Sequence, residues 1–495
     1  MTLCSAAHPL PLHIVRKHIQ KVRFTIWIGA LVMPEAATTA LQNTIKNCGR
    51  LNKARCVDLR FGNKEFGRDS DIRDLTSKDA ADRIKSAFFE YAKLLGELMP
   101  NISQVTIQPE SYFDNYTSDG LALAAQISHH WSLFMQNSVN NLSLKTLKTT
   151  ESLLDGLKGA QLQHISVYCC ENSDLYIELV RRNSAWLKRL SITSLPQNKA
   201  ATIALQPDGS GALVYPCLTD MKLLVSKTGD GAAQEGPEND PFPALAQFTC
   251  YSNFPRGLLA ILKRGCSHIR RLKIGVDGEL MDILEAERVF ANGSYTVLDS
   301  VYIIESDEEP ELDCDQAGVL ATMALNMSLN TKHVRLSGIQ PSNFAENVLP
   351  NVVPSDSLRT IDLGGIELTV DSIVILLSKF KNLAKLNVAL KDYPDGGLKA
   401  PDNDEIQRWQ GELKSCKSNI RTICIEGTSF PNSRRGAECV VLMASILQGV
   451  GRIAFKPYKK GNALYNPLKN IQFALKRPIY KKHPYVHSVI FCMEN

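Results

Sequence analysis

One short apolar pattern recurs along most of this chain and constrains its fold more than any other feature. Apolar residues stand at positions one, four and six of residues 358–363, and the same spacing returns 25 residues later at 383–388. Between the two copies lies a segment whose apolar residues repeat at the interval of an α-helix. The alternation of positions four and six predicts a strand, so each unit is predicted to be strand, turn, helix and turn.

The pattern continues in both directions from this pair. Its copies start 23 to 48 residues apart, and most intervals lie between 23 and 33. A unit of this size cannot bury its own apolar face, so neighbouring units have to stack on one another. The fifteen starts are Ala54, Ile102, Val139, Leu162, Leu187, Leu218, Leu245, Ile269, Leu298, Thr331, Leu358, Leu383, Ile420, Val450 and Val486.

The intervals between the copies hold helix-like segments and three longer insertions. Apolar residues at helical spacing predict helices within residues 79–99, 119–137, 254–266, 372–382 and 437–449. Stretches rich in Gly, Pro, Asp and Asn predict loop insertions near residues 226–243, 305–315 and 391–404.

This order of elements resembles the irregular leucine-rich repeat proteins found behind F-boxes, and the repeat length is similar to that of the ribonuclease-inhibitor-like class. The resemblance covers residues from about 54 onward. It implies an α/β solenoid, a horseshoe with parallel strands on the concave side and helices on the convex side. The family motif carries Asn or Cys at position nine, where Cys170 and Asn253 match and Ile366, Leu195 and Ile339 depart. These departures predict irregular repeats.

The N-terminal segment carries a second resemblance. Residues 9–20 resemble the opening of an F-box, where Leu-Pro precedes a helix, and the matching positions are Leu10, Pro11, Ile14, Val15 and Ile19. The resemblance implies that these residues dock the adaptor of a cullin-type ubiquitin ligase. A plain N-terminal cap on the solenoid is the alternative. Either interpretation divides the chain into a cap or degenerate F-box-like helical segment, 1–50, and a solenoid, 51–495.

Cysteine usage and the N-terminus bear on location. The thirteen cysteines are scattered and form no CxxC pair, which is typical of a reducing compartment. Residues 26–33 imitate the apolar part of a signal peptide, but the run is too short to span a bilayer and is predicted to be a buried strand or helix. We therefore expect a cytoplasmic or nuclear protein and no membrane contact.

Motifs for catalysis and for cofactors are missing from the sequence. It has no GxxxxGK[ST] phosphate loop and no GxSxG elbow, and Pro484 interrupts the helical spacing of His483 and His487. The acidic run at 305–315 lacks the order of a calcium loop and is predicted to be solvated. We expect no enzyme activity, no cofactor and no metal.

One charged segment supports an alternative function. Residues 452–482 hold nine Lys or Arg, no Asp or Glu, and several interleaved aromatic residues. Such a segment binds nucleic acid or an acidic surface, or it is a solvated cap. The candidate anion-binding residues are Lys456, Lys459, Lys460, Lys476, Arg477, Lys481 and Lys482.

The outward strand positions are the main candidate site. A solenoid offers a long rigid surface, so the chain is predicted to be a recognition scaffold that binds a protein, with a ubiquitin-ligase substrate receptor as the narrower hypothesis. The candidate binding residues on the concave face are Arg359, Asp362, Lys385, Asn387, Lys222, Lys273, Arg421 and Glu426.

Overall fold

The computed structural model describes the strands of every repeat and part of the segments between them. The described ranges are 19–27, 49–62, 96–109, 141–144, 161–168, 173–207, 211–226, 240–251, 258–264, 267–290, 294–306, 311–390, 419–426, 450–456 and 489–493, with some single or paired residues between them.

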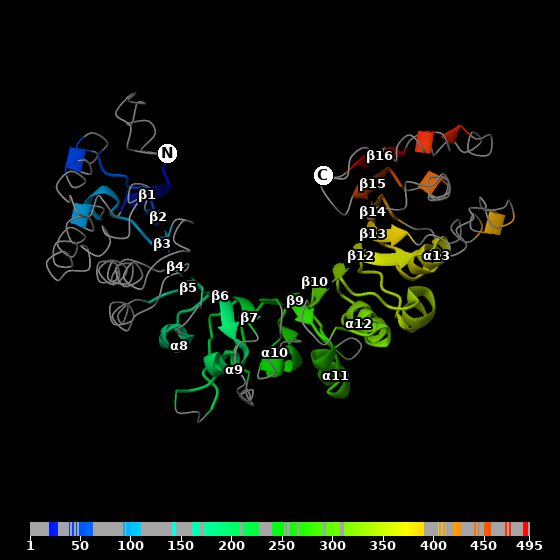
Figure 1. Cartoon of the computed structure of the whole chain (residues 1–495), viewed down its shortest axis with the longest axis horizontal. Coiled ribbons are helices and arrows are strands. Elements are labelled where there is room, and N and C mark those ends of the chain that lie inside the picture. Colours follow the sequence, from blue (N-terminus) through cyan, green and yellow to red (C-terminus); the bar gives the residue numbers. More distant parts are fainter. Residues whose placement is uncertain are drawn as a thin grey trace, which may run out of the picture. The chain divides into compact units, whose positions relative to one another are not determined.

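The chain forms two compact units. The first unit lies within Met1–Leu245 and Pro255–Ala260, and the second within Ala246–Phe254 and Ile261–Asn495. In each unit the strands follow one another in sequence order, and every strand pair recorded within a unit is parallel (Figure 1). The first unit has β1 (Lys21–Trp27), β2 (Cys56–Gly62), β3 (Gln104–Pro109), β4 (Asn141–Leu144), β5 (His164–Tyr168), β6 (Arg189–Pro196) and β7 (Asp220–Ser226). The second has β8 (Gln247–Tyr251), β9 (Arg271–Val276), β10 (Ser300–Glu305), β11 (His333–Ser337), β12 (Thr360–Leu368), β13 (Lys385–Leu390), β14 (Thr422–Glu426), β15 (Arg452–Lys456) and β16 (Ile490–Met493).

All fifteen predicted strands are present, as β2 to β16. For β2 to β15 the residue predicted at position four lies opposite position four of a neighbouring strand, as Ile361 does with Val334 and Leu386. The last strand is shifted by two residues, because Phe491 and not Val489 lies opposite Ile453. A slip of two residues keeps the same face toward the core, so the pattern alone did not exclude it. The predicted leucine-rich repeat solenoid, an α/β fold with parallel strands, is confirmed.

The series of strands also begins earlier than predicted. β1 lies inside residues 1–50, which were predicted to be an N-terminal cap or a degenerate F-box-like helical segment, and it pairs with β2 in register. Ile19, Val22 and Phe24 fit positions one, four and six of the same pattern. The F-box resemblance had assigned Ile19 to a helix, whereas in the structure it stands just before a strand and outside any helix.

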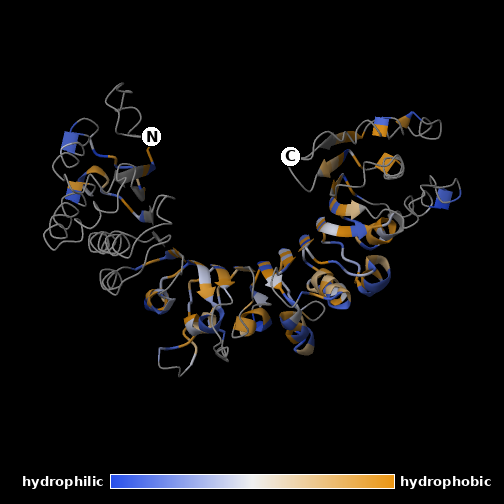
Figure 2. Cartoon of the chain, viewed as in Figure 1, coloured by the Kyte–Doolittle hydropathy of each residue, from blue (hydrophilic) through white to orange (hydrophobic). Residues whose placement is uncertain are grey.

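The core lies between the strands and the segments that follow them. Positions one, four and six are buried in nearly every described repeat, as at Leu358, Ile361 and Leu363. Figure 2 shows hydrophobic and hydrophilic residues within single strands of the second unit, as expected when one strand face packs and the other faces outward.

Helices cover one face of the strands in each unit (Figure 1). The first unit has α8 (Ser173–Arg182), α9 (Gln197–Ala200) and the 3-10 turn η3 (Ala201–Ala204). The second has α11 (Gly278–Ala286), α12 (Cys314–Asn326), the π-helical turn η6 (Phe344–Val348), the 3-10 turn η7 (Leu349–Asn351) and α13 (Val370–Lys379), and α10 (Leu259–Arg264) follows β8.

Side-chain caps fix where the longer helices of the second unit begin. Asp277 accepts a hydrogen bond from the backbone N–H of Leu280, and Thr369 accepts one from that of Ser372. Asp313 and Gln316 form a reciprocal capping box at the start of α12. Such caps are each worth about 1 kcal/mol, so these helices begin at a defined residue.

Positions eight and nine explain why the repeats depart from the family motif. Residue eight has a positive φ in three repeats, 61° at Ser194, 82° at Gly338 and 90° at Gly365. Residue nine is then Leu195, Ile339 or Ile366, and all three side chains are buried. A left-handed residue turns the chain and an apolar residue fills the core, so Asn or Cys is not needed there. Cys170 and Asn253 lie outside the described residues.

A buried residue three places before position one closes the turn that leads into several strands. The N–H of Leu218 donates to the carbonyl of Tyr215, and that of Leu383 donates to the carbonyl of Phe380. Tyr215 and Tyr295 are fully buried, and their hydroxyls donate to the carbonyls of Ile203 (2.7 Å) and Leu262 (2.6 Å). This position was not predicted from the sequence, although the aromatic residue that several repeats carry there is a visible signal.

Candidate functional site

The outward face of the second unit carries a continuous row of side chains. Residue five lies between the buried positions four and six and therefore points to the opposite strand face, where Asn387 and Cys424 are themselves buried. Parallel pairing places residue five of each strand directly beside residue five of the next strand. In strand order from β8 to β14 this row is Thr249, Lys273, Tyr302, Arg335, Asp362, Asn387 and Cys424.

Five neighbouring members of this row contact one another. The Lys273 Nζ lies 3.9 Å from the centre of the Tyr302 ring, and the Arg335 guanidinium carbon lies 4.6 Å from it. Arg335 Nε also lies 3.3 Å from a carboxylate oxygen of Asp362. The amide of Asn387 donates to the other oxygen of Asp362 at 2.7 Å. We call these five residues, from Lys273 to Asn387, the polar ladder.

The polar ladder holds long side chains in place with weak contacts. A cation beside an exposed aromatic ring contributes about 0.5–1 kcal/mol, and a surface ion pair contributes about 0.2–1 kcal/mol. The side chain of Asp362 is 21% exposed and that of Arg335 is 47% exposed, so charge remains accessible to a partner. Asp362 also accepts from the N–H of Gly364 at 3.2 Å, which fixes its rotamer. The result is an ordered polar surface.

The predicted binding residues fall into four groups in the structure. Lys273, Asp362 and Asn387 belong to the polar ladder, and Asn387, whose amide donates to Asp362, is 6% exposed. Lys222 is exposed at the same repeat position of the first unit. Of Glu426, only the backbone within β14 is described.

Three more predicted binding residues, Arg359, Lys385 and Arg421, lie at the amino-terminal ends of β12, β13 and β14 and are exposed. Arg359 donates from its guanidinium to the carbonyls of Asp356 (3.0 Å) and Asn382 (3.1 Å). It therefore ties two consecutive turns together as well as facing solvent.

Two members of the polar ladder, Tyr302 and Arg335, were not predicted from the sequence. Tyr302 and Arg335 stand at position five of their repeats, as Lys273 and Asp362 do, so the same rule would have found them. Neither looks unusual in its local sequence. Their role appears only when β9, β10, β11 and β12 are aligned side by side.

The other predicted sites lie mostly outside the described residues. This holds for the adaptor-docking candidates Leu10, Pro11, Ile14 and Val15. Of the anion-binding candidates, Lys476 is described and exposed, and Lys456 is described as backbone within β15. The remaining ones, which are not described, are Lys459, Lys460, Arg477, Lys481 and Lys482.

The described residues offer little for covalent or metal chemistry. No group of three or more His, Cys, Asp or Glu side chains there is arranged to hold a metal ion. Burial raises the pKa of the Cys250 thiol, which occupies position six of its repeat and serves as a core residue. Within the described helices, none has the length and hydrophobicity that a membrane crossing needs.

Comparison with known proteins gives similarities among solved structures. No protein-family model matches the chain, and no curated protein matches its sequence. A chain of the yeast Rad7–Elc1 complex aligns with 76% of this chain and 70% of its own length, at 12% identity and a TM-score of 0.30. A chain of the Drosophila Toll–Spätzle complex aligns with 88% of this chain and 64% of its own length, at 10% identity and a TM-score of 0.20. The fold assignment follows from the strand order and register of the chain itself.

Proposed function

We propose that this chain is a non-enzymatic recognition scaffold that binds another protein on the outward strand face of its second unit. The observation that carries the proposal is the polar ladder, in which five side chains from five consecutive strands are ordered by contacts with one another. Side chains that are already ordered lose little entropy when a partner binds. An aromatic residue and an arginine at its centre are the residue types that dominate binding energy at protein interfaces.

The test is partner capture with a matched pair of variants. Arg335→Ala removes both the contact to Tyr302 and the ion pair to Asp362. Lys222→Ala removes an exposed cation at the same repeat position in the first unit and serves as the control. Affinity purification with mass spectrometry is expected to recover a protein partner with wild type and with the control, and to lose it with Arg335→Ala. Equal recovery by both variants contradicts the proposal.

The narrower proposal is a substrate receptor of a cullin-type ubiquitin ligase. It rests on the F-box-like residues Leu10, Pro11 and Ile14. Because β1 begins at Lys21, deletion of residues 1–50 would remove a paired strand. A full-length Leu10→Asp and Ile14→Asp double variant is the sharper test. It is expected to lose the ligase adaptor in a pull-down and to keep the partner of the polar ladder, whereas unchanged adaptor recovery contradicts this narrower proposal.

Nucleic-acid binding through residues 452–482 is the alternative function. Arg452 and Lys476 are described in this segment, and both are exposed. Binding to duplex DNA through phosphates would weaken steeply with salt, with a log–log slope of about −0.9 for each phosphate neutralised. A flat salt response, or no binding of a labelled duplex, contradicts this alternative.

Location stays part of the proposal. The five cysteines whose state is described, Cys56, Cys217, Cys250, Cys314 and Cys424, are free thiols, which suits the cytoplasm or nucleus. Mass spectrometry of the protein from fractionated cells is expected to show an intact N-terminus and no glycans. A processed and glycosylated chain would contradict it.

A further inference from the structure

A second outward feature of the second unit lies at the amino-terminal edge of its strands. At each repeat the backbone N–H groups of residues two and three both donate to the carbonyl of residue two of the preceding repeat. Arg270 and Arg271, for example, share the carbonyl of Ala246, at 2.8 and 3.0 Å. The same pair of bonds recurs from β9 to β15. This repeated backbone ladder fixes residues two and three of consecutive strands about 4.8 Å apart.

The residues held by this backbone ladder are strongly basic. Seven Lys or Arg side chains occupy positions two and three of β9 to β15, and all seven are exposed. We call this set the basic strip. Its members are Arg270, Arg271, Lys332, Arg359, Lys385, Arg421 and Arg452.

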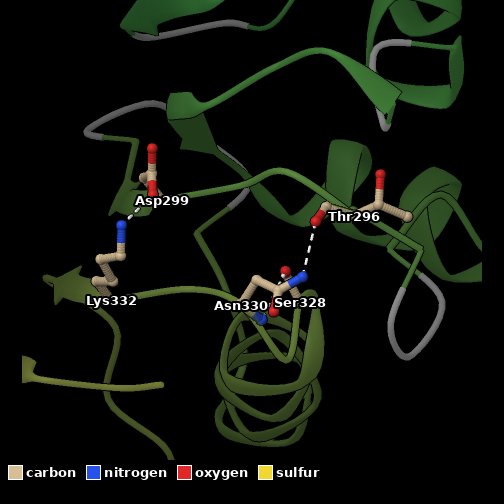
Figure 3. A network of polar contacts seen from close by, with 5 residues as sticks. All are labelled: Thr296, Asp299, Ser328, Asn330 and Lys332. Atoms are coloured by element: carbon tan, nitrogen blue, oxygen red, sulfur yellow. Dashed lines mark hydrogen bonds and ion pairs between the residues drawn. The ribbon is translucent and has the colours of Figure 1, made fainter.

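Asp299 is the one acidic residue among the described residues at these positions of the second unit. Its carboxylate lies 2.9 Å from the Nζ of Lys332, as Figure 3 shows, and this hydrogen bond lowers the pKa of Asp299. In the same view Asn330 donates to the carbonyl of Thr296 at 2.8 Å and fixes the adjoining turn. One carboxylate therefore offsets one cation, and the strip keeps a large positive excess.

The cations at position three never lie on neighbouring strands. From β9 to β15 this row is Arg271, Ser300, His333, Thr360, Lys385, Thr422 and Arg452. Like charges directly opposite each other on neighbouring strands are destabilising, and at position three the cations lie at least two strand spacings, about 10 Å, apart. At position two, Lys332 and Arg359 do lie on neighbouring strands. The hydroxyl groups between them offer neutral hydrogen-bond donors. The spacing at position three therefore limits the repulsion between those cations.

The basic strip has two ends. On β8 the corresponding residues are Ala246 and Gln247, and on β16 they are Val489 and Ile490 by register. In the first unit the described residues at the same positions include four Lys or Arg and one Asp. The seven cations therefore lie within the span β9 to β15, of which β10 carries none, and they do not follow from the repeat itself.

The chemistry of the strip favours carboxylates over nucleic-acid bases. Proteins that bind single-stranded nucleic acid combine positive charge with exposed aromatic rings for base stacking. No Phe, Tyr or Trp occurs at positions two and three among the described residues of the second unit. The nearby ring of Tyr302 is contacted by Lys273 and Arg335, one from each neighbouring strand. Five of the seven cations are arginines, whose planar fork binds carboxylates in pairs of hydrogen bonds.

We propose that the basic strip binds an Asp- and Glu-rich segment of a partner protein, laid across strands β9 to β15. This inference rests on the proposed scaffold function and specifies the chemistry of its partner. The acidic segment lies beside the polar ladder, and its carboxylates pair with cations that the backbone ladder holds at fixed spacing.

The test compares two double variants of the full chain. Arg271→Ser and Lys385→Thr introduce residue types that neighbouring strands carry at the same position, such as Ser300 and Thr360. Lys188→Ser and Arg189→Ser remove the same charge at positions two and three of β6 in the first unit and form the control. Binding of a fluorescent oligoglutamate peptide is measured by anisotropy at low and at physiological salt. The strip variant is expected to bind about fivefold to tenfold more weakly, and the control as wild type does.

Three results would overturn the proposal. They are equal loss of peptide binding in both variants, tighter binding of a labelled DNA duplex than of the peptide at equal salt, and strip-dependent self-association in sedimentation. The first indicates bulk charge, the second a nucleic-acid surface, and the third a second copy as the occupant.

Partner capture separates this proposal from the scaffold function. If Arg335→Ala loses the captured partner and the strip variant keeps it, the scaffold stands and the acidic segment is wrong. If wild type captures no partner that depends on Arg335, the scaffold function itself fails.

Discussion

At position five of their repeats, β5 to β7 of the first unit carry Ser166, Ser191 and Lys222, whereas β9 to β11 of the second carry Lys273, Tyr302 and Arg335. The strand, the turn and the backbone bonds at the amino-terminal edge are the same in both units. What the units share therefore builds the repeat, since any chain of this fold needs it. The outward residues that differ between the units are not required by the repeat fold, so they are the candidates for function.

The shared parts extend to buried polar side chains. Asn183 in the first unit is 2% exposed and Asn326 in the second is 3% exposed, and each binds two backbone groups. Buried polar groups are costly without partners, so these side chains mark places where segments must be fixed to each other. Both units therefore use a buried asparagine to join neighbouring backbone segments.

The largest expected effect comes from removing these asparagines. Asn183→Ala leaves the N–H of Leu162 and the carbonyl of Leu179 without their partner, and Asn326→Ala does the same to Val353 and Asn351. We expect each change to lower the free energy of unfolding by about 2–4 kcal/mol, because each leaves two buried backbone groups without a hydrogen-bond partner. Urea unfolding followed by hydrogen exchange measures the loss and its place. If either change proves neutral, the two asparagines are not equivalent.

Two substitutions at position eight are expected to change stability in opposite directions. Gly338→Ala should destabilise by about 1–3 kcal/mol, because its φ is 82° and a Cβ there would lie 2.9 Å from the Cβ of Glu305. Ser194→Gly should stabilise the first unit by about 1 kcal/mol, since Ser194 already has a φ of 61°. Thermal unfolding of both variants checks the signs. If both variants are less stable than wild type, the side chain of Ser194 contributes more to stability than its strained backbone costs.

The buried tyrosines provide a smaller test. Tyr215→Phe and Tyr295→Phe each remove one hydroxyl donor to a backbone carbonyl, in the first and second unit respectively. The rings still pack, Tyr215 at 5.2 Å from Phe242 and Tyr295 at 6.0 Å from Phe290 between centroids. We expect a loss of about 1 kcal/mol in each case. A clear inequality between the two, seen in urea midpoints, would show that the turns differ in strength.

The smallest effect concerns pH. Burial, aided by the charges of Arg189 and Lys188, lowers the pKa of His164 in the first unit. The unfolded state then binds a proton more readily, so stability falls as pH drops below about 6.5. Urea midpoints at about pH 7 and about pH 5 should move further apart for wild type than for His164→Gln. In the second unit Lys332 lowers the pKa of Asp299, so its contribution is present at neutral pH and is lost only below about pH 4.

The sequence by itself determined the repeat. Positions one, four and six are a local signal, because each strand buries alternate residues whatever its neighbour is, and Ile361 and Leu363 show this. The same signal was present at Ile19, Val22 and Phe24, where the F-box resemblance outweighed it. The helix predicted at 372–382 is α13, Val370–Lys379, and its start depends on the Thr369 cap.

The tertiary structure alone decided which outward residues meet. Tyr302 lies beside Lys273 and Arg335 although 29 and 33 residues separate them along the chain, and the loops between repeats vary in length. The lateral register depends on how whole repeats stack, because backbone bonds such as those to the carbonyl of Arg270 align each strand with the one before it. A one-dimensional pattern predicts that a residue faces outward. Only the stacked strands bring single outward charges together into the polar ladder and the basic strip.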